Sequence, residues 1–155
     1  MIRKLIAKAG AAYSEYAAGR RTFGELCTQL ETSGQALLAR AAQGAADDDA
    51  NRRQLRHVIG IERWGQRRLR TFLGEPTVTD EYDGYCPPAT LTLADLAGEF
   101  RTTRQDTVAI GRRLEATDPL AIDKVVHNDF GPLSAKAWLH YLELHARLEG
   151  WRLKA

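Results

Sequence analysis

The apolar residues of this 155-residue chain recur every three or four positions, and this helical spacing continues through most of its length. No stretch alternates apolar and polar residues for long enough to predict a sheet. The fold class is therefore predicted to be all-α. Because a chain of this length can bury a hydrophobic core without disulfides or a structural metal, we expect one domain over residues 1–155.

Residues that cap helix N-termini divide the chain into four long helical segments. Ser, Thr and Asp side chains accept hydrogen bonds from the free amides of a first turn, and an acidic residue three positions later can reach back to the cap. The segments are 22–44, which opens with Thr22 and Glu25; 47–74, which opens with Asp47, Asp48 and Asp49; 92–118, which opens with Thr92 and Asp95; and 134–151, which opens with Ser134. We expect an extra N-terminal helix within residues 1–21, and an antiparallel four-helix bundle with long connections at 75–91 and 118–133.

Composition excludes few functions. The formal net charge of +2, with 44% hydrophobic and 27% charged residues, argues neither for nor against an anionic partner. The two cysteines, Cys27 and Cys86, form no CxxC motif or disulfide framework, which is typical of a reducing compartment. No apolar run is long enough for a signal-peptide core or a membrane span. We therefore expect a soluble cytoplasmic protein without a membrane partner.

One predicted helix is rich in arginine, which raises the question of nucleic-acid binding. Its arginines are Arg52, Arg53, Arg56, Arg63, Arg67, Arg68 and Arg70. They scatter around the faces away from the predicted core, and the acidic residues Asp47, Asp48, Asp49 and Glu62 dilute their charge. A solvated face explains them better than a nucleic-acid site, so no nucleic-acid partner is expected.

Two histidines of the last predicted helix, His140 and His145, are five positions apart and do not form a metal-binding pair. A helix turns about 100° per residue, so these side chains point about 140° apart. His145 falls on the inward face with Trp138, whereas His140 lies nearer the flank, where a partly exposed histidine is expected. His145 and Glu149 are four apart and lie on neighbouring turns. That spacing suits metal ligands, and equally an ordinary hydrogen bond or ion pair on a helix surface.

A third histidine, His57, lies along the apolar stripe of its helix together with Trp64. A single histidine on an apolar face is more often a core residue than a ligand. Two inward histidines and an inward carboxylate on two helices favour a metal site, because bundle interiors build metal sites by such convergence. His127, in the last connector, is explained equally well by a turn, by a hydrogen bond to the backbone or by a function, and Asn128 and Asp129 are typical of a turn.

The segment around His57, RQLRHVIGIERWGQRRL, resembles the first-ligand region of the DinB-like superfamily, the four-helix bundles related to YfiT and to thiol S-transferases. The closing segment, HNDFGPLSAKAWLHYLELHARLEG, is similar to that superfamily's pattern of a histidine, a Gly-containing turn and a helix carrying HxxxH. The resemblance covers residues 22–151. It implies a divalent metal ion, Zn or Ni in many members, with water in the open coordination position. Carried over position by position, the ligands fall on His57, His145 and Glu149.

Glu149 is the departure from the family pattern, which usually has histidine there. Two imidazoles and one carboxylate with an open position form a known catalytic zinc arrangement. The alternative is a bundle that has lost its metal. The resemblance implies a metal-dependent thiol S-transferase or a hydrolase of a small substrate, with a small molecule or thiol as its partner. The second hypothesis is a metal-free bundle that binds or sequesters a small stress-related molecule.

Two further segments bear on these hypotheses. The loop with Tyr82 and Tyr85 could cover the mouth of the site and bind substrate, or it could simply pack onto the end of the bundle. The extra N-terminal helix carries Leu5, Tyr13 and Tyr16, which could supply the surface of a homodimer, a state that is frequent in the family.

Overall fold

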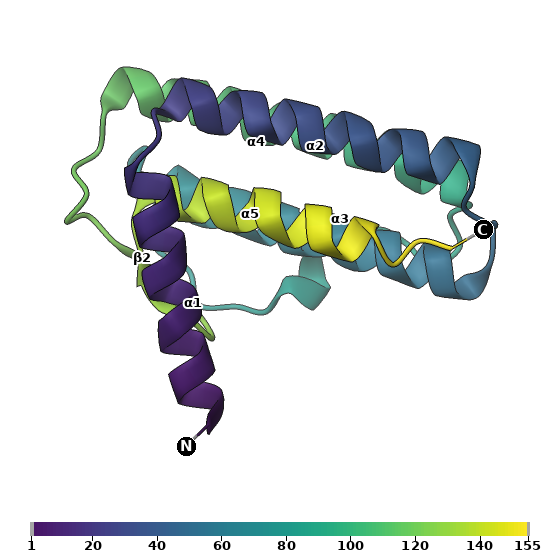
Figure 1. Ribbon diagram of the computed structural model, residues 1–155, viewed down its shortest axis with the longest axis horizontal. Coiled ribbons are helices and arrows are strands. Elements are labelled where there is room, and N and C mark those ends of the chain that lie inside the picture. The colour runs from purple at the N-terminus through teal and green to yellow at the C-terminus, as the bar shows by residue number, and fades with distance from the viewer. Residues whose placement is uncertain (1, 155) are drawn as a thin grey trace.

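The computed structural model describes residues 2–154, with side chains from Gly10 onward, and most of these residues are helical (Figure 1). The elements are α1 (Ile2–Gly19), α2 (Phe23–Gln43), α3 (Asp49–Thr71), the 3-10 helix η1 (Tyr82–Tyr85), α4 (Leu93–Thr117), β1 (Val125–His127), β2 (Gly131–Leu133) and α5 (Ala135–Gly150). The predicted all-α, bundle-like fold class is therefore confirmed. In the part of the chain that is described, no helix is both long enough and apolar enough to cross a membrane.

The four long helices pack in two layers. α2 lies against α4 and α3 lies against α5, while contacts of α3 with α4 and of α2 with α5 join the layers (Figure 1). α1 crosses one end of the layer formed by α3 and α5, and it contacts α5 and β2. The fully buried side chains of Trp138 and Phe100 are among the largest in the core. Side chains on the facing sides of α3 and α5 can therefore meet inside the molecule.

The predicted helix starts are confirmed by their hydrogen bonds. Thr22 and Glu25 form a complete capping box at the start of α2, and Thr92 and Asp95 form another at the start of α4. The Ser134 side chain accepts a hydrogen bond from a first-turn amide of α5. These starts were predictable because each capping motif lies within four consecutive residues.

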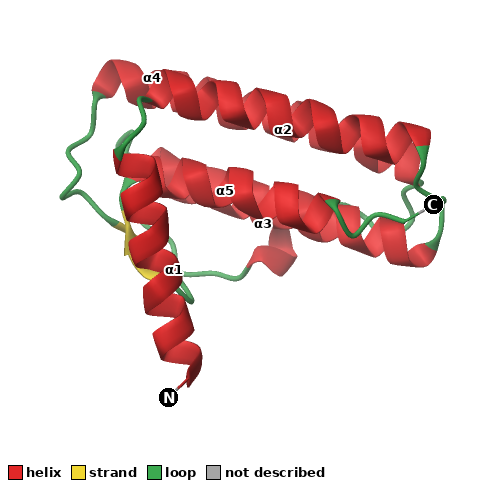
Figure 2. Ribbon diagram, viewed as in Figure 1, coloured by secondary structure: helices red, strands yellow, loops and turns green. Residues whose placement is uncertain are grey.

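The prediction that no segment forms a sheet is wrong for the connector between α4 and α5. Strands β1 and β2, yellow in Figure 2, pair antiparallel with Val126 opposite Pro132. Each has three residues, which is too short for an alternating pattern to be recognised. Asn128 and Asp129 lie in the turn between them, as predicted, and Gly131 has a positive φ of 79° that favours glycine. The hairpin contacts α3 and α1, which fixes its position beside the bundle.

Two charged side chains of α3 that were expected on a solvated face are buried instead. Glu62 is 1% exposed and pairs with Arg104 of α4, with Nε 2.8 Å from Oε1. Arg68 is also 1% exposed; its NH1 lies 2.5 Å from Oδ1 of Asp80, and its guanidinium lies 4.0 Å from the centroid of the Trp64 ring. The ion-pair partners, Arg104 and Asp80, lie outside α3, so the sequence pattern of α3 alone could not predict that Glu62 and Arg68 are buried.

The prediction that His140 is partly exposed is also wrong, since only 4% of its surface is accessible. α1 and the turn that follows it cover His140: the ring centroid of Tyr13 in α1 lies 5.9 Å from that of His140, and NH1 of Arg21 in the turn lies 3.5 Å from its Nδ1. The prediction treated this flank of the bundle as open, because the docking site of the extra helix was not known. Burial lowers the pKa of His140, so this histidine is a neutral core residue.

The outer face of α1 carries the exposed aromatic residues that the sequence analysis considered for a dimer. Tyr13 is 57% exposed and Tyr16 is 65% exposed. The side chain of Leu5 lies outside the described residues. The Tyr16 hydroxyl accepts a hydrogen bond from Arg20, so its polar end has a partner on the same helix.

Candidate functional site

The structure brings together two of the three predicted ligand residues, His57 of α3 and His145 of α5. Their Nε2 atoms lie 3.2 Å apart, and their ring centroids lie 5.1 Å apart. The helices approach closely at Gly65 of α3, where an added Cβ would lie 2.5 Å from Cδ2 of Leu142. The histidines therefore face each other across a tight contact between α3 and α5.

Burial holds both imidazoles in the neutral form. It lowers the pKa of His145 to about 3, and the neighbouring His57 adds to this effect. Burial also lowers the pKa of His57, although the negative charge of Glu149 opposes the change. A neutral imidazole has one nitrogen with a free lone pair. The contact between the two Nε2 atoms is therefore either an N–H···N hydrogen bond or a pair of lone pairs directed at a cation.

Glu149, the third predicted ligand, is held by other partners. Its Oε2 accepts hydrogen bonds from Gln54 Nε2 at 2.5 Å and from Arg152 NH1 at 3.0 Å. Among the side chains that the structure describes, those of residues 10–154, no group of three or more His, Cys, Asp or Glu is placed where it could hold a metal ion. Two predicted ligands thus converge, while the carboxylate of the third points to a glutamine and an arginine.

A cavity of about 260 Å³ opens beside the histidine pair. Its lining residues are His57, Ile61, Trp64, Glu81, Tyr82, His127, Asn128, Asp129, Tyr141 and His145. Tyr141, one turn before His145 on α5, is mostly enclosed, and burial raises the pKa of its hydroxyl well above the usual range. We call this space the histidine cavity, because three of the four histidines of the chain line it.

The loop after α3 lines one side of the histidine cavity with Glu81 and Tyr82. The ring of Tyr82 in η1 packs edge-on against His57, with centroids 5.0 Å apart. Tyr85 has a structural role instead: its hydroxyl donates to Asp80 Oδ2 at 2.6 Å. Gly60 of α3 lets the loop approach, because a Cβ there would collide with Sγ of Cys86. Of the two alternatives for the loop tyrosines, Tyr82 therefore faces the cavity and Tyr85 packs the loop.

His127 is a member of the site that the sequence left undecided. Its Nδ1 accepts hydrogen bonds from the backbone N–H groups of Asp129 at 3.1 Å and Phe130 at 3.2 Å. The side chain is 4% exposed, and its Nε2 has no hydrogen-bond partner among the described residues. Burial lowers the pKa of His127 to about 4. The turn therefore accounts for the position of Nδ1, whereas Nε2 forms no hydrogen bond with the described residues.

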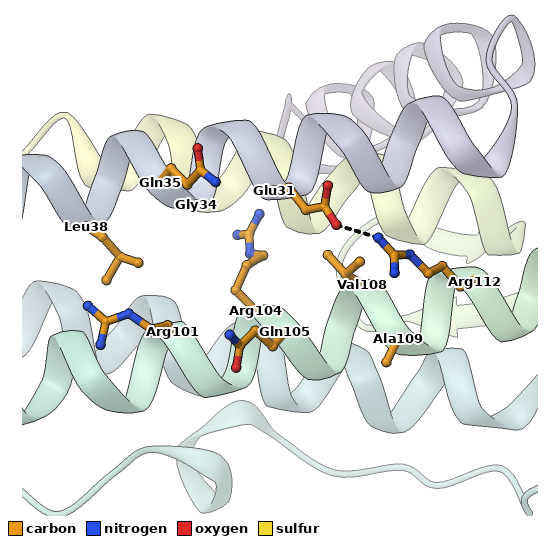
Figure 3. Close-up of a pocket in the computed structure, with 10 residues that line it drawn as sticks. All are labelled: Glu31, Gly34, Gln35, Leu38, Arg101, Arg104, Gln105, Val108, Ala109 and Arg112. Carbon is orange, nitrogen blue, oxygen red and sulfur yellow. Dashed lines mark hydrogen bonds and ion pairs between the residues drawn. The ribbon is translucent and has the colours of Figure 1, made fainter.

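A larger cavity, of about 690 Å³, lies between α2 and α4 (Figure 3). Three of its four charged residues already have partners, since Arg112 pairs with Glu31 at 2.8 Å and Arg104 pairs with buried Glu62, whereas the exposed Arg101 forms no ion pair with the described residues. The residues that line it include no histidine or cysteine. We therefore assign the candidate site to the smaller histidine cavity.

No family model matches this sequence, and no curated protein or solved structure is significantly similar to it. The resemblance to DinB-like bundles therefore stays a prediction from the motifs alone.

Proposed function

We propose that His57 and His145 bind a divalent metal ion with Glu149 as the third protein ligand, and that the histidine cavity admits a small substrate or thiol. In this proposal the protein is a metal-dependent thiol S-transferase or small-substrate hydrolase of the DinB-like type. The observation that carries it is the edge-on contact of two neutral imidazoles, with Nε2 atoms 3.2 Å apart, beside a partly open cavity.

The separation of the two nitrogens supports the proposal. Zinc binds imidazole nitrogen at about 2.0–2.1 Å, and a tetrahedral angle between two such bonds places the nitrogens about 3.3–3.4 Å apart. The observed 3.2 Å is close to this separation. Metal ligation also requires neutral imidazoles, and burial supplies that form for both rings. The donor pair therefore suits Zn or Ni without a change in protonation.

The third ligand requires a rearrangement of one side chain. Glu149 would have to exchange its hydrogen bonds to Gln54 and Arg152 for the metal ion. His127 is a poor substitute, because its Nδ1 already accepts two backbone hydrogen bonds and its Nε2 consequently carries the proton. The carboxylate thus remains the best candidate, as the sequence motif implies.

The chain itself would supply binding, orientation and exclusion of water. A divalent ion bound here would lower the pKa of a coordinated water or thiol. His57 and His145 would hold it through Nε2, and Trp64, Tyr82 and Tyr141, which line the adjoining space, would reduce the access of bulk water to it. No side chain is assigned as a separate general base.

The same resemblance carries two structural inferences, the bundle topology and a homodimer, and the cysteine usage of the sequence supports a third inference, a cytoplasmic location. We infer that α2, α3, α4 and α5 form the antiparallel four-helix bundle of the family, with α1 as an addition. We also infer a cytoplasmic location and a homodimer that uses the exposed tyrosines of α1. Sedimentation of wild type and of a Tyr13→Ser, Tyr16→Ser double variant tests the dimer, and a wild-type monomer would contradict it.

A metal-free ligand-binding protein is the second candidate, because the carboxylate of Glu149 is already satisfied by Gln54 and Arg152. A direct hydrogen bond between His57 and His145 would make the pair complete without an ion. In this alternative, a chelator leaves ligand binding in the histidine cavity unchanged.

Calorimetric titration of untagged protein with Zn²⁺ and Ni²⁺, together with elemental analysis, tests the first candidate. His57→Ala and His145→Ala should each abolish stoichiometric binding, and Glu149→Gln should weaken it at least about tenfold. His140→Gln on the same helix as His145 is the matched control and should bind as wild type does. If wild type binds neither ion, the proposed function is refuted.

A further inference from the structure

The Nε2 atom of His127, which has no hydrogen-bond partner among the described residues, carries the proton of the neutral ring and is therefore a hydrogen-bond donor. Two backbone N–H groups, those of Asp129 and Phe130, point at Nδ1 from 3.1 and 3.2 Å. A proton on Nδ1 would face both of these donors, so the neutral ring carries its proton on Nε2. The hairpin turn thereby selects the tautomer that presents an Nε2–H on the opposite side of the ring.

This donor is buried in a ring that lines the histidine cavity. His127 is 4% exposed, and its Nε2 has no hydrogen-bond partner among the described side chains, those of residues 10–154. Aromatic rings hold the imidazole in place: Phe130 stacks on it at 4.6 Å, and Trp64 and Tyr141 pack edge-on at 5.0 and 4.6 Å between centroids. The Nε2 atom is itself closed off from solvent, so an acceptor in the adjoining cavity reaches it only when the neighbouring rings move slightly apart. Such an acceptor would satisfy a donor that the protein leaves unpaired.

We propose that Nε2–H of His127 donates a hydrogen bond to the oxygen of a small, uncharged carbonyl compound, such as a planar amide, bound in the histidine cavity. This inference deepens the proposed function, because it rests on that function's cavity as the substrate site. It does not require a metal ion.

The charges and shape of the cavity select this class of ligand. A donor N–H disfavours a cation, and the carboxylates of Glu81 and Asp129 among the lining residues disfavour an anion. The aromatic lining suits a flat group, and a volume of about 260 Å³ is smaller than a typical drug-sized site of about 300–1,000 Å³.

The test uses benzamide as the probe, with benzoate and benzylamine as charged analogues of similar size. Binding to the full chain is followed by NMR in the presence of a chelator, so that metal binding plays no part. We expect benzamide to bind more tightly than either analogue, and the ¹⁵N-bound proton at Nε2 of His127 to shift on binding. Wild type that binds no benzamide, or that binds benzoate more tightly, would overturn the proposal.

The variant His127→Asn isolates the donor. Asparagine accepts backbone hydrogen bonds from the two following amides in turns, so its Oδ1 can replace Nδ1 while nothing replaces Nε2–H. We expect benzamide affinity to fall about tenfold, and Asn128→Ala in the same turn to have a smaller effect. Unchanged affinity in His127→Asn overturns the proposal. Should that variant fail to fold, the Nε2 proton of wild type decides alone, because an unmoved resonance at saturating benzamide also overturns it.

The outcomes separate this inference from the proposed function. Benzamide binding that depends on His127, in a protein that takes up no Zn²⁺ or Ni²⁺, would leave the carbonyl site standing and refute the metal site. If the protein binds Zn²⁺ or Ni²⁺ but His127→Asn leaves benzamide affinity unchanged, the metal site stands and the carbonyl site is refuted.

Discussion

Acid should destabilise this protein through His127, because the folded chain cannot accommodate its protonated ring. Protonation would place an N–H on Nδ1, directly opposite the backbone N–H groups of Asp129 and Phe130. Burial of the ring opposes the charge as well, and the positive charge of Arg68 adds to that effect, while Asp129 acts in the opposite direction. The unfolded chain has no such restriction and takes up the proton near pH 6.5.

The pKa values give the size of the effect. The pKa of His127 is about 4 in the folded protein, against about 6.5 in an unfolded chain. Between these values the unfolded state binds more protons, so the free energy of unfolding falls as the pH falls. From pH 7 to pH 5 this linkage removes about 2 kcal/mol, a large share of the roughly 5–15 kcal/mol typical of a whole domain.

Urea unfolding at pH 7 and pH 5 measures this loss in wild type and in His127→Asn. The variant loses packing at both pH values, but the change between them should be smaller than in wild type by about 2 kcal/mol. Val126→Ala, an exposed neighbour in the same strand, is the control and should keep the wild-type pH dependence. If His127→Asn responds to pH as wild type does, the ring is not held neutral by the turn and the reasoning is refuted.

Two further predictions concern the packing that positions the site. Arg104→Met should lower the free energy of unfolding, measured in urea, by about 3–5 kcal/mol, because it leaves the buried carboxylate of Glu62 without a counter-charge. Adding Glu62→Met should recover most of this loss. A double variant as unstable as the single one would contradict this explanation. Gly65→Ala should cost about 1–3 kcal/mol in the same assay and weaken Zn²⁺ binding in calorimetry, since its Cβ would collide with Leu142 and force α3 away from α5. Gly98→Ala, where a Cβ meets no neighbouring atom, is the matched control and should be neutral or stabilising.

Local features of this fold could be predicted from the sequence, and long-range ones could not. The caps at Thr22, Thr92 and Ser134 each depend on atoms within four residues, so the sequence places those helix starts directly. Burial of Glu62 depends on Arg104, 42 residues further along the chain. Burial of His140 depends on where α1 docks, which no periodicity within α5 specifies.

In the candidate site too, the features that depend on a single helix could be predicted, and those that depend on distant residues could not. Helical spacing places His57 and His145 on inward faces, and neighbouring helices in a bundle are enough to bring such faces together. The direction of the Glu149 carboxylate is decided by Gln54 on another helix and by Arg152 beyond the end of its own. Competition among these partners is a matter of side-chain rotamers, and a sequence pattern gives only the position of a residue on the helix.

The three histidines of the cavity differ in which ring nitrogen the protein occupies, and this difference assigns them separate roles. The hairpin uses Nδ1 of His127, which leaves a donor at Nε2 and makes this ring unsuitable as a metal ligand at neutral pH. His57 and His145 meet through their Nε2 atoms, and only one proton can lie between two nitrogens 3.2 Å apart. At least one lone pair is therefore directed into that contact, and moving the remaining proton to Nδ1 of its own ring would free the other. If both proposals hold, the cavity would offer two acceptors to a cation and one donor to an oxygen atom, and a polarising ion and a carbonyl substrate would then be bound side by side.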